Sequence, residues 1–492
     1  MNIVNEEVTK ILSNFCAEIK KAKKLPDQAM ISISNTFTYI QKHNEETIDD
    51  KSIEKLIKQT IDVLEANREI EKLNVLGLSL CIYCLPHIKK EKTVSIIVEY
   101  IRNYKKSGKK IDSITTLIFV IYEYLLLTGS KEMPFVFILA DCLNCLSKED
   151  IKIERLKYIL RVLIRLSQDE NVHKLMIEKG VVKVMLETLN KMIKQMKEYF
   201  DLKRLKELKQ SEMKEDENTN DMINELNSEQ KEQVEITEEM KEIENIDEIE
   251  LNEELEDIEL ITFPIEIINN IIQNSKDCKN QIIKLYLSLY QQCNLYEESV
   301  VIKEMIMSGL YFMTKDKLEK ETLDQIYKLF TSEKVSSIIQ NNNQMNPIIV
   351  SNYLGILNNL QEYNDYKLFQ TLELIQNIMI IVKIMKDDNV IQKYGFHLLR
   401  LASFTKESLT VECFEIINNN YQSFMNDQLF LEDISIVLYN ISLKYEHDEE
   451  CRNLKNEIIK IIEDLKQAHE KNKIIYAIWY ALTNDKVLNF IP

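Results

Sequence analysis

The feature of this sequence that most limits its fold is a hydrophobic helix end that recurs every 40 or 41 residues. In the middle of the chain the step from Leu166 to Leu289 is 123 residues, which is three times 41. A fixed pitch of this size is typical of stacked helical repeats, in which each unit buries its apolar face against its neighbours. We therefore predict an array of stacked helices. The terminal core residues that define the pitch are Leu85, Leu126, Leu166, Leu289, Leu329, Leu360, Leu401, Ile441 and Leu482.

Composition supports an all-α fold. The 492 residues include 7 Gly and 6 Pro, whereas average proteins contain roughly 7% and 5% of these residues. Both residues end helices and build turns, so their scarcity predicts helices joined by short polar connections. Nine cysteines without the spacing of a disulfide scaffold indicate a reducing compartment. The acidic start at residues 1–7 does not have the pattern of a secretory signal peptide, which agrees with that compartment. We expect the cytoplasm, with the nucleus as the second compartment.

The clearest repeat lies at residues 153–189. Leu156, Ile159, Leu160 and Leu163 form one apolar stripe, and a polar break at 167–171 can cap the next helix. A short helix over 172–179 then ends at Gly180, where the missing Cβ permits a left-handed turn. A second copy of this pattern ends at Gly309.

This stretch, ENVHKLMIEKGVVKVMLETL, resembles the armadillo repeat, with its short first helix, glycine turn, second helix and long third helix. The resemblance implies a right-handed armadillo-like α-solenoid of about ten repeats, with HEAT-like pairs where a short helix is lost. We place the repeats at 1–210 and 259–492. The family's usual role implies protein binding along a concave groove.

Residues 211–258 interrupt the repeats. They contain 20 Asp or Glu and 3 Lys, a local charge of −17 out of a net −18, and no aromatic residue, Pro or Gly. Such a composition predicts a disordered acidic insert. The preceding stretch 182–209 is basic, so one hypothesis is that the insert docks on it, or near Arg161 and Arg165, and competes with partners. The alternative is a solubilising loop.

The sequence contains none of the common catalytic or cofactor motifs, so we predict no enzyme activity, no cofactor and no small-molecule substrate. Two Cys-x-x-Cys pairs, Cys81/Cys84 and Cys142/Cys145, could suggest zinc. Their separation of 61 residues is about one and a half repeats, so we favour buried thiols and predict no metal. His397 lies on an apolar helix and is expected to be structural.

Charge and hydropathy exclude two classes of partner. Phosphates would be repelled by the net charge of −18, so nucleic acid is not expected. The most apolar stretch, 111–127, contains Asp112 and Glu123 and is too short to cross a bilayer, so we expect no membrane insertion. The expected partner is another protein.

The third helices of armadillo-like proteins line the groove, and the importin-α family displays a Trp and, four residues later, an Asn from successive third helices. At the positions that match the Trp stand Arg161, Gly355, Phe396, Ile436 and Ala477, so the tryptophan array is missing. This departure argues against binding of import signals. The resemblance nevertheless implies that groove residues stand at these two positions. The candidates are Arg161, Arg165, Asn359, Phe396, Arg400 and Asn440.

Two functions follow as expectations. The leading one is a non-catalytic scaffold or adaptor whose groove binds a protein partner, with modulation by the acidic insert. The alternative is a regulatory cofactor of the nucleotide-exchange type for a chaperone or G-protein NTPase, because helical-repeat proteins of similar build clamp such domains. No motif in the sequence selects between the two.

Overall fold

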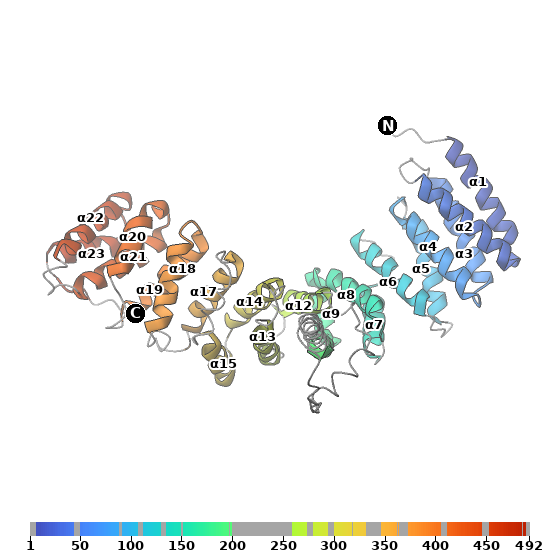
Figure 1. The fold of residues 1–492 in the computed structure, drawn as a ribbon. Coiled ribbons are helices and arrows are strands. Elements are labelled where there is room, and N and C mark those ends of the chain that lie inside the picture. The colour runs from blue at the N-terminus through green and yellow to red at the C-terminus, as the bar shows by residue number, and fades with distance from the viewer. Residues whose placement is uncertain are drawn as a thin grey trace, which may run out of the picture. The chain divides into compact units, whose positions relative to one another are not determined.

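The fold is known from a computed structural model (Figure 1). It describes the following residues: 6–43, 50–87, 91–106, 112–128, 134–148, 151–195, 197–198, 258–272, 279–293, 300–316, 318–330, 346–361, 363, 372–404, 411–444, 452–484 and 486–488. Within these residues all regular secondary structure is helical. The chain forms two compact units, Met1–Asn274 and Ser275–Pro492. The predicted insert 211–258 lies, apart from its last residue, outside the described residues.

Unit 1 contains ten labelled α-helices, two short 3-10 helices (η) and a further helical stretch over 181–195. Their bounds are α1 Glu6–Lys21, η1 Ala22–Lys24, α2 Pro26–Lys42, α3 Asp50–Ala66, α4 Glu71–Cys84, η2 Leu85–His87, α5 Glu91–Lys106, α6 Asp112–Leu127, α7 Phe135–Leu146, α8 Ile153–Ser167, α9 Glu170–Glu178 and α12 Glu259–Ile272.

The helices of unit 1 stack in two rows. In one row α2, α4, α6, α8 and α12 each contact the next member, and in the other row α1 packs on α3 and α3 on α5. The helix α12, which begins directly after the predicted insert, packs on α8 and belongs to unit 1. Residues 211–258 interrupt the sequence, while the row of helices continues past them.

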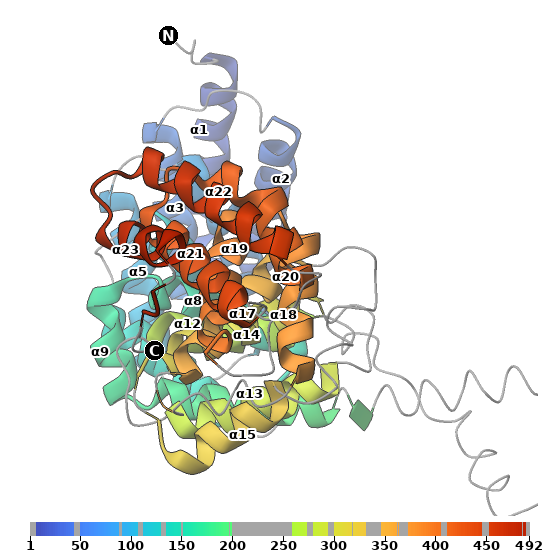
Figure 2. The ribbon, with the colours of Figure 1, turned by 90° about the vertical axis from the view of Figure 1, so that its left-hand side faces the viewer.

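Unit 2 has the same two-row organisation. Its long row is α14, α17, α19, α21 and α23, and the other row contains α13, α15, α18, α20 and α22. In the turned view of Figure 2, α18 and α20 lie to one side of α19 and α21. The bounds are α13 Lys279–Cys293, α14 Val300–Thr314, α15 Lys320–Phe330, α17 Pro347–Gln361, α18 Leu372–Ile384, α19 Asn389–Ala402, α20 Val411–Asn420, η7 Tyr421–Phe424, α21 Gln428–Lys444, α22 Arg452–Ala468 and α23 Lys473–Thr483.

The glycine turn predicted at Gly180 is confirmed, and the one predicted at Gly309 is wrong. Asp169 caps α9 by accepting a hydrogen bond from the Asn171 amide, and Gly180 has φ 74° before the helical stretch 181–195. Gly309, by contrast, lies buried inside the continuous helix α14. A small residue in a helix can also serve close packing, so glycine alone did not identify the turn.

Other close contacts depend on glycine. A Cβ on Gly395 would lie 2.3 Å from a methyl carbon of Val382, and one on Gly355 would lie 2.6 Å from the Tyr311 ring. These glycines let α19 approach α18, and α17 approach α14, more closely than any side chain would allow.

No helix in the described part of the chain is long and apolar enough to cross a membrane.

A candidate protein-binding face

The six predicted groove residues all lie on the long rows. Arg161 and Arg165 are on α8 in unit 1; Asn359 is on α17, Phe396 and Arg400 on α19, and Asn440 on α21 in unit 2. Because the two units are separate bodies, each set is described within its own unit.

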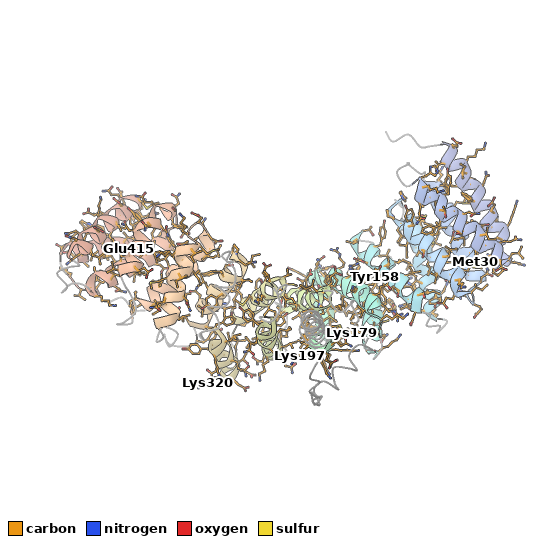
Figure 3. All side chains as sticks on the ribbon, viewed as in Figure 1. Met30, Tyr158, Lys179, Lys197, Lys320 and Glu415 are labelled. Carbon is orange, nitrogen blue, oxygen red and sulfur yellow. The ribbon has the colours of Figure 1, made fainter. Side chains whose placement is uncertain are left out.

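In unit 1, the two arginines of α8 face the acidic side of α12. Arg161 forms an ion pair of 3.0 Å with Glu259 and lies over the rings of Tyr158 and Phe263, at 5.8 and 6.0 Å from the ring centres. Tyr158 is labelled in Figure 3. Arg165 is exposed, and its charge partly offsets the effect of burial, which raises the pKa of Glu266. Arg161 therefore joins two helices, and Arg165 keeps its charge at the surface.

The asparagines of the long rows connect successive helices. The Asn359 amide donates a 2.9 Å hydrogen bond to the Thr314 hydroxyl of α14, and the Asn440 amide donates one of 2.6 Å to the Ser403 hydroxyl just after α19. The sequence analysis missed a third member in unit 1, Asn270, which donates to the Ser167 hydroxyl at 2.9 Å.

Each of these hydroxyls also donates to the carbonyl three residues before it, at the end of its own helix. The hydroxyl thus satisfies a backbone carbonyl at the C-terminus of one helix, and the asparagine of the next helix is fixed against it by its hydrogen bond to that hydroxyl. Asn270 stands one residue before the core residue Ile271, as Asn359 stands before Leu360 and Asn440 before Ile441. An Asn directly before the last core residue of a helix could therefore have identified Asn270 from the sequence.

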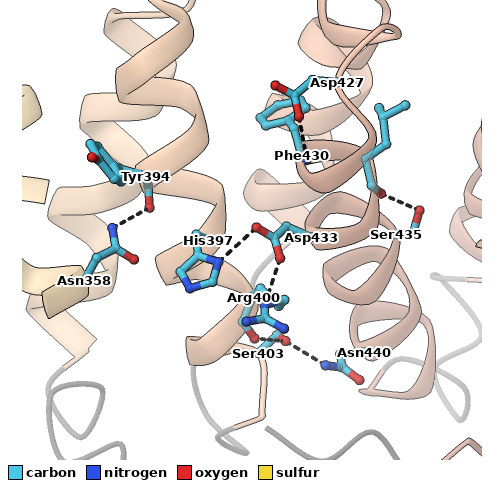
Figure 4. A network of polar contacts seen from close by, with 11 residues as sticks. Asn358, Tyr394, His397, Arg400, Ser403, Asp427, Phe430, Asp433, Ser435 and Asn440 are labelled. Atoms are coloured by element: carbon cyan, nitrogen blue, oxygen red, sulfur yellow. Dashed lines mark hydrogen bonds and ion pairs between the residues drawn. The ribbon is translucent and has the colours of Figure 1, made fainter. Parts of the chain in front are cut away.

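A carboxylate on α21 holds two side chains of α19 (Figure 4). The Asp433 oxygens lie 2.8 Å from Arg400 Nε and 3.1 Å from His397 Nδ1. Arg400 and Asp433 are mostly buried, whereas the His397 side chain is 42% exposed. Arg400 therefore serves mainly to join α19 to α21, and His397 offers its outer edge to solvent.

Phe396 does not belong to an exposed face, and its prediction as an anchor is corrected here. Its side chain is 0% exposed and packs edge-to-face on Phe430 of α21, with ring centres 5.2 Å apart. The corresponding positions Gly355 and Ile436 are also buried. Three of the four unit 2 positions that match the Trp of the importin-α family are therefore buried in the helix stack, and the fourth, Ala477, is half-buried.

A line of exposed aliphatic side chains in unit 2 was not among the predicted groove residues. Ile348, Val390 and Leu429 are the second residues of α17, α19 and α21, and they are 51%, 51% and 74% exposed. These three residues are called the aliphatic row below. Val301, the second residue of α14, extends the row at 49% exposure.

The first turn of each long-row helix explains why the aliphatic row is exposed. Asn346 and Asp388 accept hydrogen bonds from the backbone amides of the second and third helical residues, which sets the start of each helix. The third residue then points into the core, and the second points outward. Asp427 caps α21 and Asn472 caps α23 in the same way. In the sequence, each of these helix starts can be recognised by a four-residue pattern: Asn or Asp, then any residue, then two aliphatic or aromatic residues.

The same cap residues fix the helix N-termini to one another. Asn346 donates to Glu304 of α14, and the Asn472 amide donates a 2.7 Å hydrogen bond to Glu432 of α21. Lys393 of α19 pairs with Asp427, and its hydrogen bond is the main cause that lowers the pKa of that carboxyl. The N-terminal ends of these helices consequently lie along one edge of unit 2.

An aromatic pair lies in the middle of this face. The hydroxyls of Tyr311 on α14 and Tyr394 on α19 are 2.7 Å apart. Burial, followed by the hydrogen bond with Tyr311, raises the pKa of Tyr394 to about 12. The Tyr394 phenol therefore stays neutral at physiological pH and can exchange hydrogen bonds with a peptide backbone.

Three of the four thiols of the Cys-x-x-Cys pairs lie in the helical core, and the fourth, Cys145, is half-buried. Cys81, Cys84 and Cys142 are buried, and burial raises the pKa of each thiol. In the described residues no three His, Cys, Asp or Glu side chains are grouped closely enough to hold a metal ion. Thiols with raised pKa values are poor nucleophiles and poor metal ligands, because both roles need the thiolate.

Comparison with solved structures shows a likeness to an engineered protein whose crystal structure was determined by the Northeast Structural Genomics Consortium. The match covers 95% of this chain and 98% of that chain, with a TM-score of 0.50 and 9% sequence identity. At this identity the likeness shows the fold alone. The sequence matches no protein-family model and no curated protein. The two rows of stacked helices and this likeness define an all-α helical-repeat fold.

Proposed function

We propose that this chain is a non-catalytic scaffold or adaptor that binds a protein partner along the aliphatic row of unit 2. The supporting observation is that Ile348, Val390 and Leu429 are exposed at the same position of three successive helices, α17, α19 and α21, each of which packs on the next. Single exposed aliphatic residues are common on any surface, but an ordered line of them is typical of a binding site.

The spacing of the row indicates what can bind there. Packed helices lie about 8–10 Å apart, so neighbouring side chains of the row repeat at about that distance. An α-helix places residues i and i+7 on one side at a spacing of about 10.5 Å. A polyproline II segment places i and i+3 on one side at about 9.3 Å. Either kind of partner segment could occupy all three positions at once.

Polar groups further along the same helices would orient a partner that extends beyond the row, since Asn359 and Asn440 lie about 16 Å along the helix axis from Ile348 and Leu429. The Asn359 and Asn440 amide groups use their N–H donors within the protein, and among the described residues their carbonyl oxygens accept no hydrogen bond. Those oxygens and the exposed edge of His397 can bind the backbone of a partner. Arg161 and Arg165 are separate candidates for a protein contact, on α8 of unit 1. Each such group would add specificity to the apolar contact.

The type of helical repeat is part of the same proposal. We propose that the repeats are of the armadillo and HEAT type, and the support is local. α8, α9 and the helical stretch 181–195 follow the armadillo order around Gly180, whereas unit 2 is built mainly from helix pairs. The proposal includes no catalytic step.

The test is affinity purification from the native cell with quantitative mass spectrometry. The chain with Ile348, Val390 and Leu429 changed to Ser is compared with the native chain. The matched control changes three exposed aliphatic residues of the other row of unit 2 to Ser, namely Ile380, Ile384 and Val411.

Burying one aliphatic side chain contributes about 1.5–3 kcal/mol, so loss of three should remove the partner from the purified material. We expect proteins that the native chain and the control variant retain and the row variant loses. If both variants retain or lose the same proteins, the aliphatic row is not the binding site.

A further inference from the structure

His397 of α19 differs from His173 and His469 in the ring nitrogen that it uses for its hydrogen bond. Its Nδ1 lies 3.1 Å from the Asp433 carboxylate of α21 (Figure 4). His173 and His469 instead contact backbone carbonyl oxygens through Nε2, at 2.7 and 2.5 Å. Carboxylate and carbonyl oxygens only accept hydrogen bonds, so in each ring the contacting nitrogen carries the proton. Neutral His397 is therefore the Nδ1–H tautomer, and its Nε2 carries a lone pair that can accept a hydrogen bond.

This Nε2 atom lies on the outer edge of the ring. The His397 side chain is 42% exposed, whereas that of Asp433 is 16% exposed. Asp433 also forms an ion pair of 2.8 Å with Arg400 Nε, and this second contact holds the carboxylate in place. Among the described residues Nε2 has no hydrogen-bond partner. The fixed carboxylate therefore sets the tautomer and leaves one acceptor facing solvent.

Other titratable groups on the surrounding helices have partners of their own. The neighbouring α17 contains no Asp, Glu, Lys, Arg or His. On α19 itself, the Tyr394 hydroxyl contacts that of Tyr311. The remaining pairs are Lys393 with Asp427, Glu432 with Asn472, and Lys383 of α18 with Glu412 of α20. Asp433, shared with Arg400, is the charged group in direct contact with the imidazole.

We propose that His397 makes partner binding depend on pH by selecting the kind of hydrogen-bonding group that it meets. In the neutral ring, Nε2 accepts a hydrogen bond from a backbone N–H of the partner. In the protonated ring both nitrogens are donors, so Nε2–H would face that N–H and repel it. Histidine is the side chain that ordinarily changes charge between pH 5 and 8. Binding should accordingly weaken as pH falls through this range.

This inference rests on the proposed function and names the chemistry of the partner at one position. The partner segment would reach from the aliphatic row to His397, which stands seven residues after Val390 on α19. That separation is about 10.5 Å along the helix axis. The segment would present an unpaired backbone N–H there, which excludes proline at that position.

The tautomer is measured first, and this measurement needs no partner. The chain is prepared with isotope-labelled histidine, and NMR follows the ring nitrogens over a pH series. The His397→Gln variant identifies the His397 signals. We expect Nδ1–H for neutral His397 and Nε2–H for neutral His173 and His469. Asp433→Ala should remove the Nδ1–H preference of His397 alone. A neutral His397 with its proton on Nε2 would overturn the proposal.

The second experiment extends the affinity purification used to test the aliphatic row. Proteins that depend on the row are bound at neutral pH. They are then washed at about one pH unit below the point at which the NMR series shows His397 becoming protonated. The His397→Gln side chain can place an oxygen acceptor near the outer edge and cannot become charged. His469→Gln is the matched control, because it is the same substitution at another half-buried histidine of unit 2.

We expect the acid wash to lower the retained partner about tenfold or more on the native chain and on His469→Gln, because a favourable hydrogen bond is replaced by two unpaired donors. His397→Gln should keep the partner to within about threefold. Equal loss from all three chains, or no loss from the native chain, would refute this inference and leave the proposed function standing. Absence of any row-dependent partner at neutral pH would refute both.

Discussion

The contact between α18 and α19 depends on the absence of one methyl group, and Gly395→Ala restores that group. The new Cβ would lie 2.3 Å from a methyl carbon of the fully buried Val382. Alanine favours a helix over glycine by about 1 kcal/mol, while overpacking a core costs about 1–3 kcal/mol. The expected net effect on the free energy of unfolding is a loss of about 0–2 kcal/mol.

A second substitution separates the two contributions. Val382→Ala removes the methyl groups that the new Cβ would meet, so the helix propensity of alanine should then prevail. Gly395→Ala should accordingly stabilise the Val382→Ala background by up to about 1 kcal/mol. The coupling between the two sites is expected to be about 1–3 kcal/mol.

The assay is hydrogen exchange of α18 and α19 followed by mass spectrometry. A local measurement is needed because long repeat arrays depart from two-state unfolding. Gly180→Ala is the control, since its strain comes from a φ of +74° with no atom near the new Cβ. Val382→Ala should not rescue it. If Gly395→Ala increased protection in the native background, the close approach of α18 and α19 would not be required.

Three further predictions concern the face of unit 2. Asn440→Ala and Ser403→Ala should each lower the free energy of local opening of α19 and α21 by about 1 kcal/mol, as measured by hydrogen exchange. Because the two residues share one hydrogen bond, the loss in the double variant should be smaller than additive, and full additivity would show that this hydrogen bond contributes nothing. Asp427 has a lowered pKa in the folded protein, so its contribution to stability is complete above its ordinary pKa of about 4 and is lost as pH falls through the lowered value. Asp427→Asn, which can still cap α21, should therefore differ from the native chain at neutral pH and converge with it in acid, and a constant difference would contradict the pairing. Tyr311→Phe should lower the pKa of Tyr394 from about 12, as followed by NMR of labelled tyrosine; an unchanged value would assign the whole shift to burial.

Much of the local structure could be predicted from sequence alone. The pitch of 40 or 41 residues, the scarcity of glycine and proline, and the stripe from Leu156 to Leu163 predicted an all-α stack, and the structure confirms it as all-helical. The turn at Gly180 was predicted because its neighbours supply a polar break before it and a helix start after it. These features depend on hydrogen bonds and burial within one or two helical turns, which a single sequence records directly.

The positions that face a partner could not be predicted in this way. Phe396 and Tyr394 are both aromatic and stand two residues apart on α19, yet Phe396 is fully buried against Phe430 of α21 whereas Tyr394 is only half-buried. The exposure of the Ile348, Val390 and Leu429 side chains likewise depends on which helices pack beside them.

The sequence by itself determined that the chain forms stacked helices, which stripe of the helix at 153–167 is apolar, and where the short helix before Gly180 ends. Only the tertiary structure decided which apolar and polar residues remain exposed. The physical reason is that helix formation and capping act between residues a few positions apart, whereas exposure depends on neighbours about 40 residues away along the chain, one repeat further on.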